Sequence, residues 1–220
     1  MPSVSEQVPT SERATVGEVV ADAVAERTED SRVAPAVVRV FRELDAVDRE
    51  VYAAIARTPT PTIDAALRQL SDAANFSGLW MGVAGGLALG AGRRGRRAAA
   101  EGLAAIALTS AVVNQGIKPL LERGRPNREN AGVVAGRHVR MPMSTSFPSG
   151  HSASAFAFAG AVSEELPLLS LPLRFLAGAV AYSRVHTGVH YPGDALVGAI
   201  IGGAVAAMTR DVVRLAFRRR

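Results

Sequence analysis

Residues 148–163 read PSGHSASAFAFAGAVS, a short polar motif that leads directly into an apolar stretch. A proline and small polar residues in front of an apolar run are typical of the start of a helix. The first turn of a helix has backbone N–H groups without partners, which makes it a ready anion site. Gly150 lets the backbone come close to a ligand. The stretch therefore predicts a helix that binds an anion at its N-terminus, beside Ser149 and His151.

Other apolar stretches with few charges lie on both sides of this one. Together they number five and cover residues 76–91, 102–117, 153–163, 166–183 and 195–209. Each is shorter or weaker than the roughly 20 residues that span a bilayer core. Prolines lie at or near their ends, where helices stop or start. The pattern predicts an all-α fold, a polytopic membrane helix bundle with about five spanning helices.

Composition favours a membrane protein over a nucleic-acid-binding one. Apolar residues make up 48% of the chain but aromatic residues only 5%, a mixture that suits close helix packing in a bilayer. A soluble helical protein is the alternative on composition alone. The net charge of +5 would allow nucleic acid as a partner, but the arginines cluster between or after the apolar stretches, as in membrane proteins. We expect no nucleic acid partner, and the absence of cysteine excludes thiolate catalysis and cysteine metal sites.

The N-terminal third has a different character. Residues 1–34 are polar without an apolar period or a secretory signal, and we predict a disordered tail. Residues 35–75 carry apolar residues at helical spacing, interrupted by prolines at 58–62, which predicts two amphipathic helices at the membrane interface. A soluble helix hairpin explains this pattern equally well. Residues 76–220 then form the membrane-embedded core.

The side chains that are capable of chemistry lie in three short segments, residues 118–126, 148–151 and 183–194. If the five stretches are antiparallel helices, all three segments lie at the same end of the bundle. The predicted site consists of Lys118, Arg125, Ser149, Gly150, His151, Arg184, His190 and Asp194.

This set fits a phosphate ester better than a structural cluster. Unpaired cations near a bilayer are costly, and a bound dianion would neutralise them. Arginine forks and a lysine ammonium match phosphate oxygens. Asp194 lies four residues after His190 and can orient its imidazole for attack on phosphorus, as a carboxylate does in a catalytic triad. His151 is then available as general acid and base, and no metal or other cofactor is required.

The three segments resemble the signature motifs of the type 2 phosphatidic acid phosphatase superfamily, the lipid phosphate phosphatases. The motifs have the forms K-x6-R-P, P-S-G-H and S-R-x5-H-x3-D, and every specified position is present between Lys118 and Asp194. The resemblance implies a phosphohistidine on His190, acid–base catalysis by His151 and metal-independent hydrolysis. It implies phosphate contacts from Lys118, Arg125, Ser149, Gly150, His151 and Arg184.

Several alternatives stay open. The substrate could be phosphatidate, phosphatidylglycerol phosphate or a polyprenyl-linked phosphate, and the oligomeric state is not indicated. Vanadium haloperoxidases resemble the family at the same site, although they are larger and soluble. An inactive membrane scaffold or lipid-binding protein with this fold is the alternative from another class.

The remaining charged residues have simpler interpretations. We expect loop charges in contact with solvent or lipid headgroups at four arginines, helix caps or surface positions at two histidines, and the solvent-exposed face of a helix at two aspartates. These residues are Arg123, Arg128, Arg137, Arg140, His138, His186, Asp45 and Asp48.

Charge also predicts the orientation in the cell membrane. The arginines of residues 93–97 and 218–220 are separated by four predicted crossings, so they lie on one side. The positive-inside rule assigns that side to the cytoplasm, and the site then faces the extracytoplasmic side. Five crossings place the N-terminal tail outside, unless residues 37–74 add a sixth crossing or a re-entrant insertion.

Overall fold

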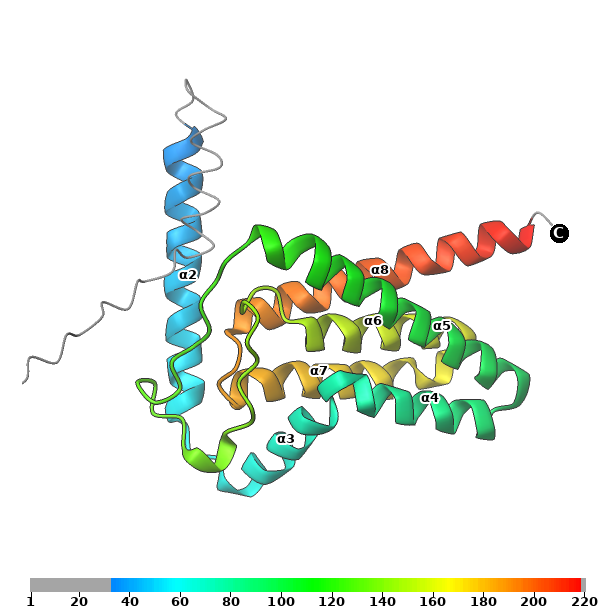
Figure 1. Cartoon of the computed structure of the whole chain (residues 1–220), viewed down its shortest axis with the longest axis horizontal. Helices are drawn as coiled ribbons and strands as arrows, with labels where there is room; N and C mark the ends of the chain where they lie inside the picture. The colour runs from blue at the N-terminus through cyan, green and yellow to red at the C-terminus, as the bar shows by residue number, and fades with distance from the viewer. Residues whose placement is uncertain (1–32, 219–220) are drawn as a thin grey trace, which may run out of the picture.

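The computed structural model describes residues 33–218, with side chains described for residues 39–40 and 42–209. This part of the chain contains helices and loops but no strand, as Figure 1 shows. The prediction for residues 1–34 falls almost entirely outside it. The α-helices are α2 (Val33–Arg57), α3 (Pro61–Ala73), α4 (Gly78–Gly90), α5 (Gly92–Ala111), α6 (Gly150–Glu165), α7 (Ser170–His186) and α8 (Pro192–Arg218).

Helix α6 is the centre of the bundle and packs against α5, α7 and α8. Its residues are mostly small, and its largest fully buried side chains are Phe158 and Val162. Small residues let the helix backbones approach closely. The approach of α8 is so close that a side chain at Gly202 would collide with the backbone of Ala153. The alanine- and glycine-rich sequence is therefore what allows α6 to be enclosed.

Each of the five predicted apolar stretches forms a helix. Three helical segments are long and apolar enough to cross a membrane: Gly92–Leu120, Pro167–His186 and Pro192–Thr209. Helix α4 has 13 residues and α6 has 16, which is short of the roughly 20 residues that a crossing requires. The all-α membrane bundle is confirmed, whereas the number of five crossings stays a prediction.

The second apolar stretch differs from its predicted bounds. Helix α5 begins at Gly92, so the arginines of residues 93–97 lie in its first turns and not in a connection. The connection from α4 is Ala91 alone. At its other end α5 continues as a π-helix (Val112–Ile117) and a 3-10 turn (Lys118–Leu120). The segment thus runs from one end of the bundle to the other and delivers Lys118 to the end near α2 (Figure 1).

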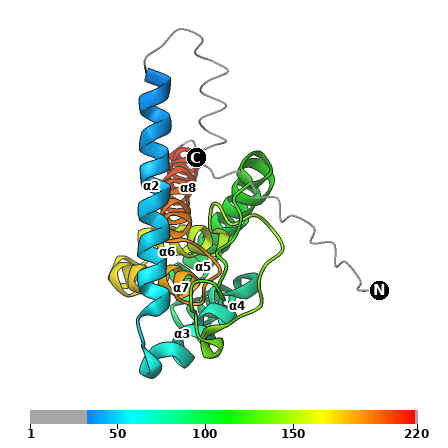
Figure 2. The same cartoon turned by 90° about the vertical axis from the view of Figure 1, so that its left-hand side faces the viewer.

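The two predicted amphipathic helices are present as α2 and α3. Helix α2 lies across one end of the bundle, roughly perpendicular to α5–α8, as both Figures 1 and 2 show. Tyr52 and Ala56 of α2 pack against Val185, Tyr191 and Ala195, which surround the α7–α8 turn. Helix α2 therefore covers the bundle end at which α6 and α8 begin.

Candidate active site

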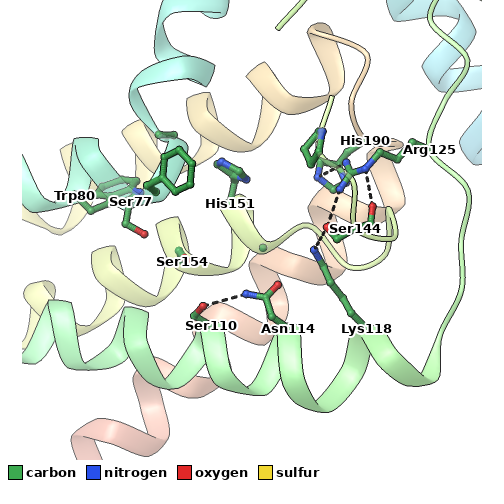
Figure 3. Close-up of a pocket in the computed structure, with 14 residues that line it drawn as sticks. Ser77, Trp80, Ser110, Asn114, Lys118, Arg125, Ser144, His151, Ser154 and His190 are labelled. Atoms are coloured by element: carbon green, nitrogen blue, oxygen red, sulfur yellow. Dashed lines mark hydrogen bonds between the residues drawn. The ribbon is translucent and has the colours of Figure 1, made fainter. Parts of the chain in front are cut away.

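The three predicted segments meet in a cavity of about 300 Å³ beside the N-terminus of α6 (Figure 3). Lys118 and Arg125 reach it from the end of the α5 segment and the following loop, His151 from α6 and His190 from the α7–α8 turn. Gly150 also lines the cavity. Antiparallel helices thus bring together residues that are up to 72 positions apart, from Lys118 to His190.

His190 is buried and held by Asp194. Its Nδ1 lies 3.4 Å from Asp194 Oδ2, which also accepts hydrogen bonds from the Ser146 hydroxyl and from the Tyr191 N–H at 2.9 Å. A carboxylate facing Nδ1 favours the tautomer with the proton on Nδ1 and leaves Nε2 unprotonated. Burial lowers the pKa of His190 to about 4, although Asp194 opposes this shift. The imidazole is therefore neutral near pH 7, which is the form that acts as a nucleophile.

One cation lies next to the lone pair of His190 Nε2, and a second lines the same cavity. Arg125 NH1 is 3.2 Å from His190 Nε2, and the same group donates to the Val189 carbonyl at 2.7 Å. Arg125 Nε donates to the Ser144 carbonyl, and Lys118 Nζ donates to the Ser144 hydroxyl at 3.1 Å. Burial lowers the pKa of Arg125 to about 10, so its guanidinium stays charged at pH 7. Ser144 therefore holds both cations in the cavity that His190 also lines.

Arg184 and Ser149 lie behind the cavity wall. Arg184 is fully buried, and its NH1 donates to the hydroxyl and carbonyl of Ser71 at 2.5 and 3.1 Å. Its Nε and NH2 have no hydrogen-bond partner within the described part of the chain, so two donors remain for an anion. Ser149 instead caps α6: its hydroxyl accepts from the Ser152 N–H at 3.3 Å.

His151 is held by a residue that lies outside the three motifs. Its Nε2 is 3.0 Å from the side-chain oxygen of Asn75, whose amide nitrogen donates to Asp72 at 3.4 Å. Because an amide oxygen only accepts, Nε2 carries the proton and Nδ1 is left for the substrate. Asn75 precedes Phe76 and Ser77, which both adopt positive φ values of 52° and 60°. The sequence contained no signal for this contact.

Arg123, Asp45 and Asp48 were predicted to lie at the surface, and the structure contradicts this. Arg123 is only 6% exposed and forms ion pairs with Asp194, Asp45 and Asp48 at 2.6, 2.6 and 2.8 Å. Burial alone would lower the pKa of Arg123, but Asp194 and Asp48 raise it above its ordinary value. The physical reason is that the buried Asp194 carboxylate requires a cation, and α2 supplies two further carboxylates to that cation.

The predictions for Arg137 and His186 were also wrong. Both side chains are 1% exposed, and both contact the same oxygen of Asp64 at 2.9 Å. Arg137 also donates to the Thr58 carbonyl at 2.6 Å, just after the end of α2. A guanidinium at that position satisfies carbonyls that the helix end leaves free. These residues fix the corner between α2 and α3.

Taken together, the site combines three cations, two imidazoles and a buried carboxylate at one end of a helical bundle. Within residues 33–218, no three histidine, aspartate or glutamate side chains are arranged to hold a metal ion. The arrangement defines an anion-binding site equipped for nucleophilic attack by a histidine.

Comparison with known proteins agrees with this class of site. The chain belongs to the PAP2 superfamily, whose family model matches residues 99–218. The resemblance found in the three motifs is thereby confirmed.

Curated relatives include phosphatases from several bacteria. Decaprenylphosphoryl-5-phosphoribose phosphatase of Mycobacterium tuberculosis is 36% identical over 44% of this chain, which spans about half (51%) of that relative. The protein of the same name from Mycolicibacterium smegmatis is 36% identical over 70% of this chain and 80% of its own length. Lipid A 4'-phosphatase of Bacteroides thetaiotaomicron is 38% identical over 45% of this chain and 48% of its own.

Two solved structures share the fold. LpxE of Aquifex aeolicus superposes with a TM-score of 0.59 at 22% identity, covering 75% of this chain and 95% of that one. The PAP2 type phosphatidylglycerolphosphate phosphatase of Bacillus subtilis gives a TM-score of 0.60 at 18% identity, covering 89% and 92%. At these identities the likeness concerns the fold alone.

Proposed function

We propose that the protein is an integral-membrane phosphatase that hydrolyses a lipid phosphate through a phosphohistidine on His190. The observation that carries this proposal is the environment of the His190 Nε2 lone pair. Asp194 holds the opposite edge of the ring, and Arg125 lies 3.2 Å from the lone pair in the cavity. A phosphate bound by Arg125 would therefore bring phosphorus close to the nucleophile.

In the first step, His190 Nε2 forms a bond to phosphorus and the ester P–O bond breaks. The negative charge of the bound phosphate would favour a second proton on His151, at Nδ1. His151 gives this proton to the leaving alkoxide, which departs as the lipid alcohol, and the ring becomes neutral. Lys118, Arg125 and Arg184 balance the negative charge on the phosphoryl oxygens in the transition state. Asp194 stabilises the positive charge that develops on the His190 ring.

In the second step, the neutral His151 accepts a proton from water, and the water oxygen attacks the phosphohistidine. The N–P bond breaks, inorganic phosphate leaves and His190 becomes neutral again. One water is consumed and one phosphate is released per ester, so no redox partner is required. The donor set of Lys118, Arg125 and Arg184 meets the charge on phosphorus without a metal ion.

The named relatives support a lipid as the substrate. The mycobacterial relatives act on decaprenylphosphoryl-5-phosphoribose and the Bacteroides relative acts on lipid A, according to their names. The exposed apolar side chains around the bundle agree with a substrate that is delivered from a bilayer.

We further infer that α4–α8 cross the cell membrane and that the cavity faces the extracytoplasmic side. Two observations support this orientation: the start of α5, with its arginines, and the C-terminal end of α8 both lie at the end of the bundle away from α2 (Figure 1). Positive clusters are typical of the cytoplasmic side. Helices α2 and α3 of the predicted interfacial unit, residues 35–75, then lie at the outer surface of the core formed by residues 76–220.

A phosphoenzyme assay tests the proposal. Purified protein mixed with a ³²P-labelled lipid phosphate in detergent micelles should form an acid-labile, base-stable phosphoprotein that disappears when His190 is replaced by Gln. Turnover of His190→Gln should fall by at least 10³-fold, because the covalent route is lost. His138→Gln, which changes a histidine outside the cavity, is the matched control. Near-normal turnover of His190→Gln would contradict the mechanism. A wild-type protein that hydrolyses no lipid phosphate would favour the alternative of an inactive membrane scaffold.

A further inference from the structure

The cavity extends beyond the groups that would bind phosphate. Its volume of about 300 Å³ lies at the lower end of the range of small-molecule sites, roughly 300–1,000 Å³. Lys118, Arg125 and His190 line only one side of it (Figure 3). Part of the substrate other than its phosphate must therefore occupy the rest.

The remaining side carries four small polar residues, which we call the polar wall: Ser77, Ser110, Asn114 and Ser154. In Figure 3 the three serines lie on the side of His151 that faces away from His190, with Asn114 between them and Lys118. Asn114 donates to the Ser110 hydroxyl at 3.0 Å, which leaves its amide oxygen available. The hydroxyls of Ser77 and Ser154 make no hydrogen bond to any residue in the described part of the chain. The polar wall thus offers several free hydrogen-bonding groups to a ligand.

The position of these residues in the membrane argues against an incidental polar surface. Ser110 and Asn114 belong to the spanning segment Gly92–Leu120, and both side chains are exposed. Polar groups in a spanning helix are costly unless they meet a partner or a water-filled cavity. The helix changes from α to π at Val112, and short π-helical turns are frequent at functional sites. The polar wall is therefore a built feature of the cavity.

The geometry of phosphoryl transfer relates the polar wall to the substrate. Attacking and leaving atoms lie roughly in line across phosphorus, so attack from His190 directs the leaving oxygen to the opposite side. That side holds His151 and, beyond it, the polar wall. Given the proposed phosphatase function, on which this inference rests, the polar wall meets the leaving group.

We propose that the polar wall is a subsite for a hydroxylated leaving group, so that the hydrolysed phosphate is carried by a sugar or polyol headgroup of a lipid. A lipid whose phosphate is attached directly to an apolar chain would leave these hydroxyls and the Asn114 amide unpaired. The rings of Phe76 and Trp80 also line the cavity, and Phe76 is 95% exposed. The lipid part of the substrate leaves the cavity along these rings.

A substrate panel in mixed micelles tests the subsite. The panel contains two lipids with hydroxylated leaving groups, phosphatidylglycerophosphate and phosphatidylinositol 4-phosphate, and two without them, phosphatidate and undecaprenyl phosphate. We expect kcat/KM for at least one hydroxylated substrate to exceed that for both others by about tenfold or more, the effect of two or three hydrogen bonds. Equal or lower values for both hydroxylated substrates would overturn the inference but not the phosphatase function.

Two variants connect that preference to the polar wall. Asn114→Leu and Ser154→Ala should each lower the ratio of kcat/KM between the preferred hydroxylated substrate and phosphatidate about threefold, the share of one hydrogen bond. The matched control is Gln115→Leu, a neighbouring exposed amide that does not line the cavity, and it should leave the ratio unchanged. A ratio that stays at the wild-type value in both variants overturns the subsite. Loss of activity on all four lipids in the wild type would contradict the proposed function instead.

Discussion

The His151 imidazole shows how one contact determines which atom is available for chemistry. Asn75 accepts a hydrogen bond from Nε2, so Nδ1 is the ring nitrogen that stays available for chemistry. Asp72 in turn holds the Asn75 amide in that orientation. In the mechanism proposed above, Asn75 would be a positioning residue, since it would act on the reaction through His151.

We expect Asn75→Ala to lower kcat about tenfold or more while KM changes little. The reason is that a general acid contributes about 10²–10⁴-fold, and part of this depends on the orientation of the ring. Steady-state kinetics with the preferred lipid substrate measure both constants, and Asn75→Gln tests whether a longer amide restores part of kcat. Asn130→Ala, an exposed asparagine in the 121–149 loop, serves as the control. A higher KM with unchanged kcat in Asn75→Ala would indicate a substrate contact and contradict the positioning role.

At the scale of elements, α2 is connected to the Asp194 carboxylate although it lies far from every motif in the sequence. Arg123 joins Asp45 and Asp48 of α2 to Asp194 in α8, and Asp48 also accepts from the Gly193 N–H at 2.6 Å. The first turn of α8 is thus held through the side chain of Asp194 and through the backbone N–H of Gly193. The helix that covers the cavity end also fixes the His190–Asp194 pair.

Replacing Arg123 by Met should destabilise the protein strongly. Removing one partner of a buried ion pair costs about 3–5 kcal/mol, because the remaining charge stays buried without compensation. Thermal unfolding in detergent should show the loss, and activity at a permissive temperature should fall because Asp194 is no longer fixed. Arg140→Met changes an exposed arginine of the same loop and should shift stability by no more than about 0.5 kcal/mol. Equal stability of the two variants would show that the ion pairs of Arg123 do not contribute to the stability of the protein.

Across the whole molecule, the sequence predicted the parts that depend on local pattern. Apolar runs identified each bundle helix, and motif spacing identified Lys118, His151 and His190 as neighbours in space. The pairs Arg123–Asp45 and His151–Asn75 were missed because their partners are 78 and 76 positions apart. An isolated aspartate or asparagine has no spacing that reveals such a partner. Burial of a charge becomes visible only when the tertiary structure surrounds it.

The arrangement of charge over the whole bundle leads to a test of its orientation. The 121–149 loop, which contributes Arg125 and Ser144 to the cavity, lies at the end near α2, and the start of α5 lies at the opposite end (Figure 1). Arg140 in that loop and Arg96 in α5 are both exposed, and the chain has no cysteine, so each can be replaced by a single reactive Cys. Arg137 is unsuitable for this purpose, since it is buried against Asp64.

In intact cells, a membrane-impermeant maleimide should label Arg140→Cys but not Arg96→Cys. The expectation follows from the positive-inside rule, which retains the arginines of residues 93–97 in the cytoplasm and turns the cavity outward. Permeabilised cells provide the control, because both cysteines should react once the reagent has access to both sides. The reverse pattern in intact cells would place the cavity in the cytoplasm, where the enzyme would meet lipid phosphates of the inner leaflet.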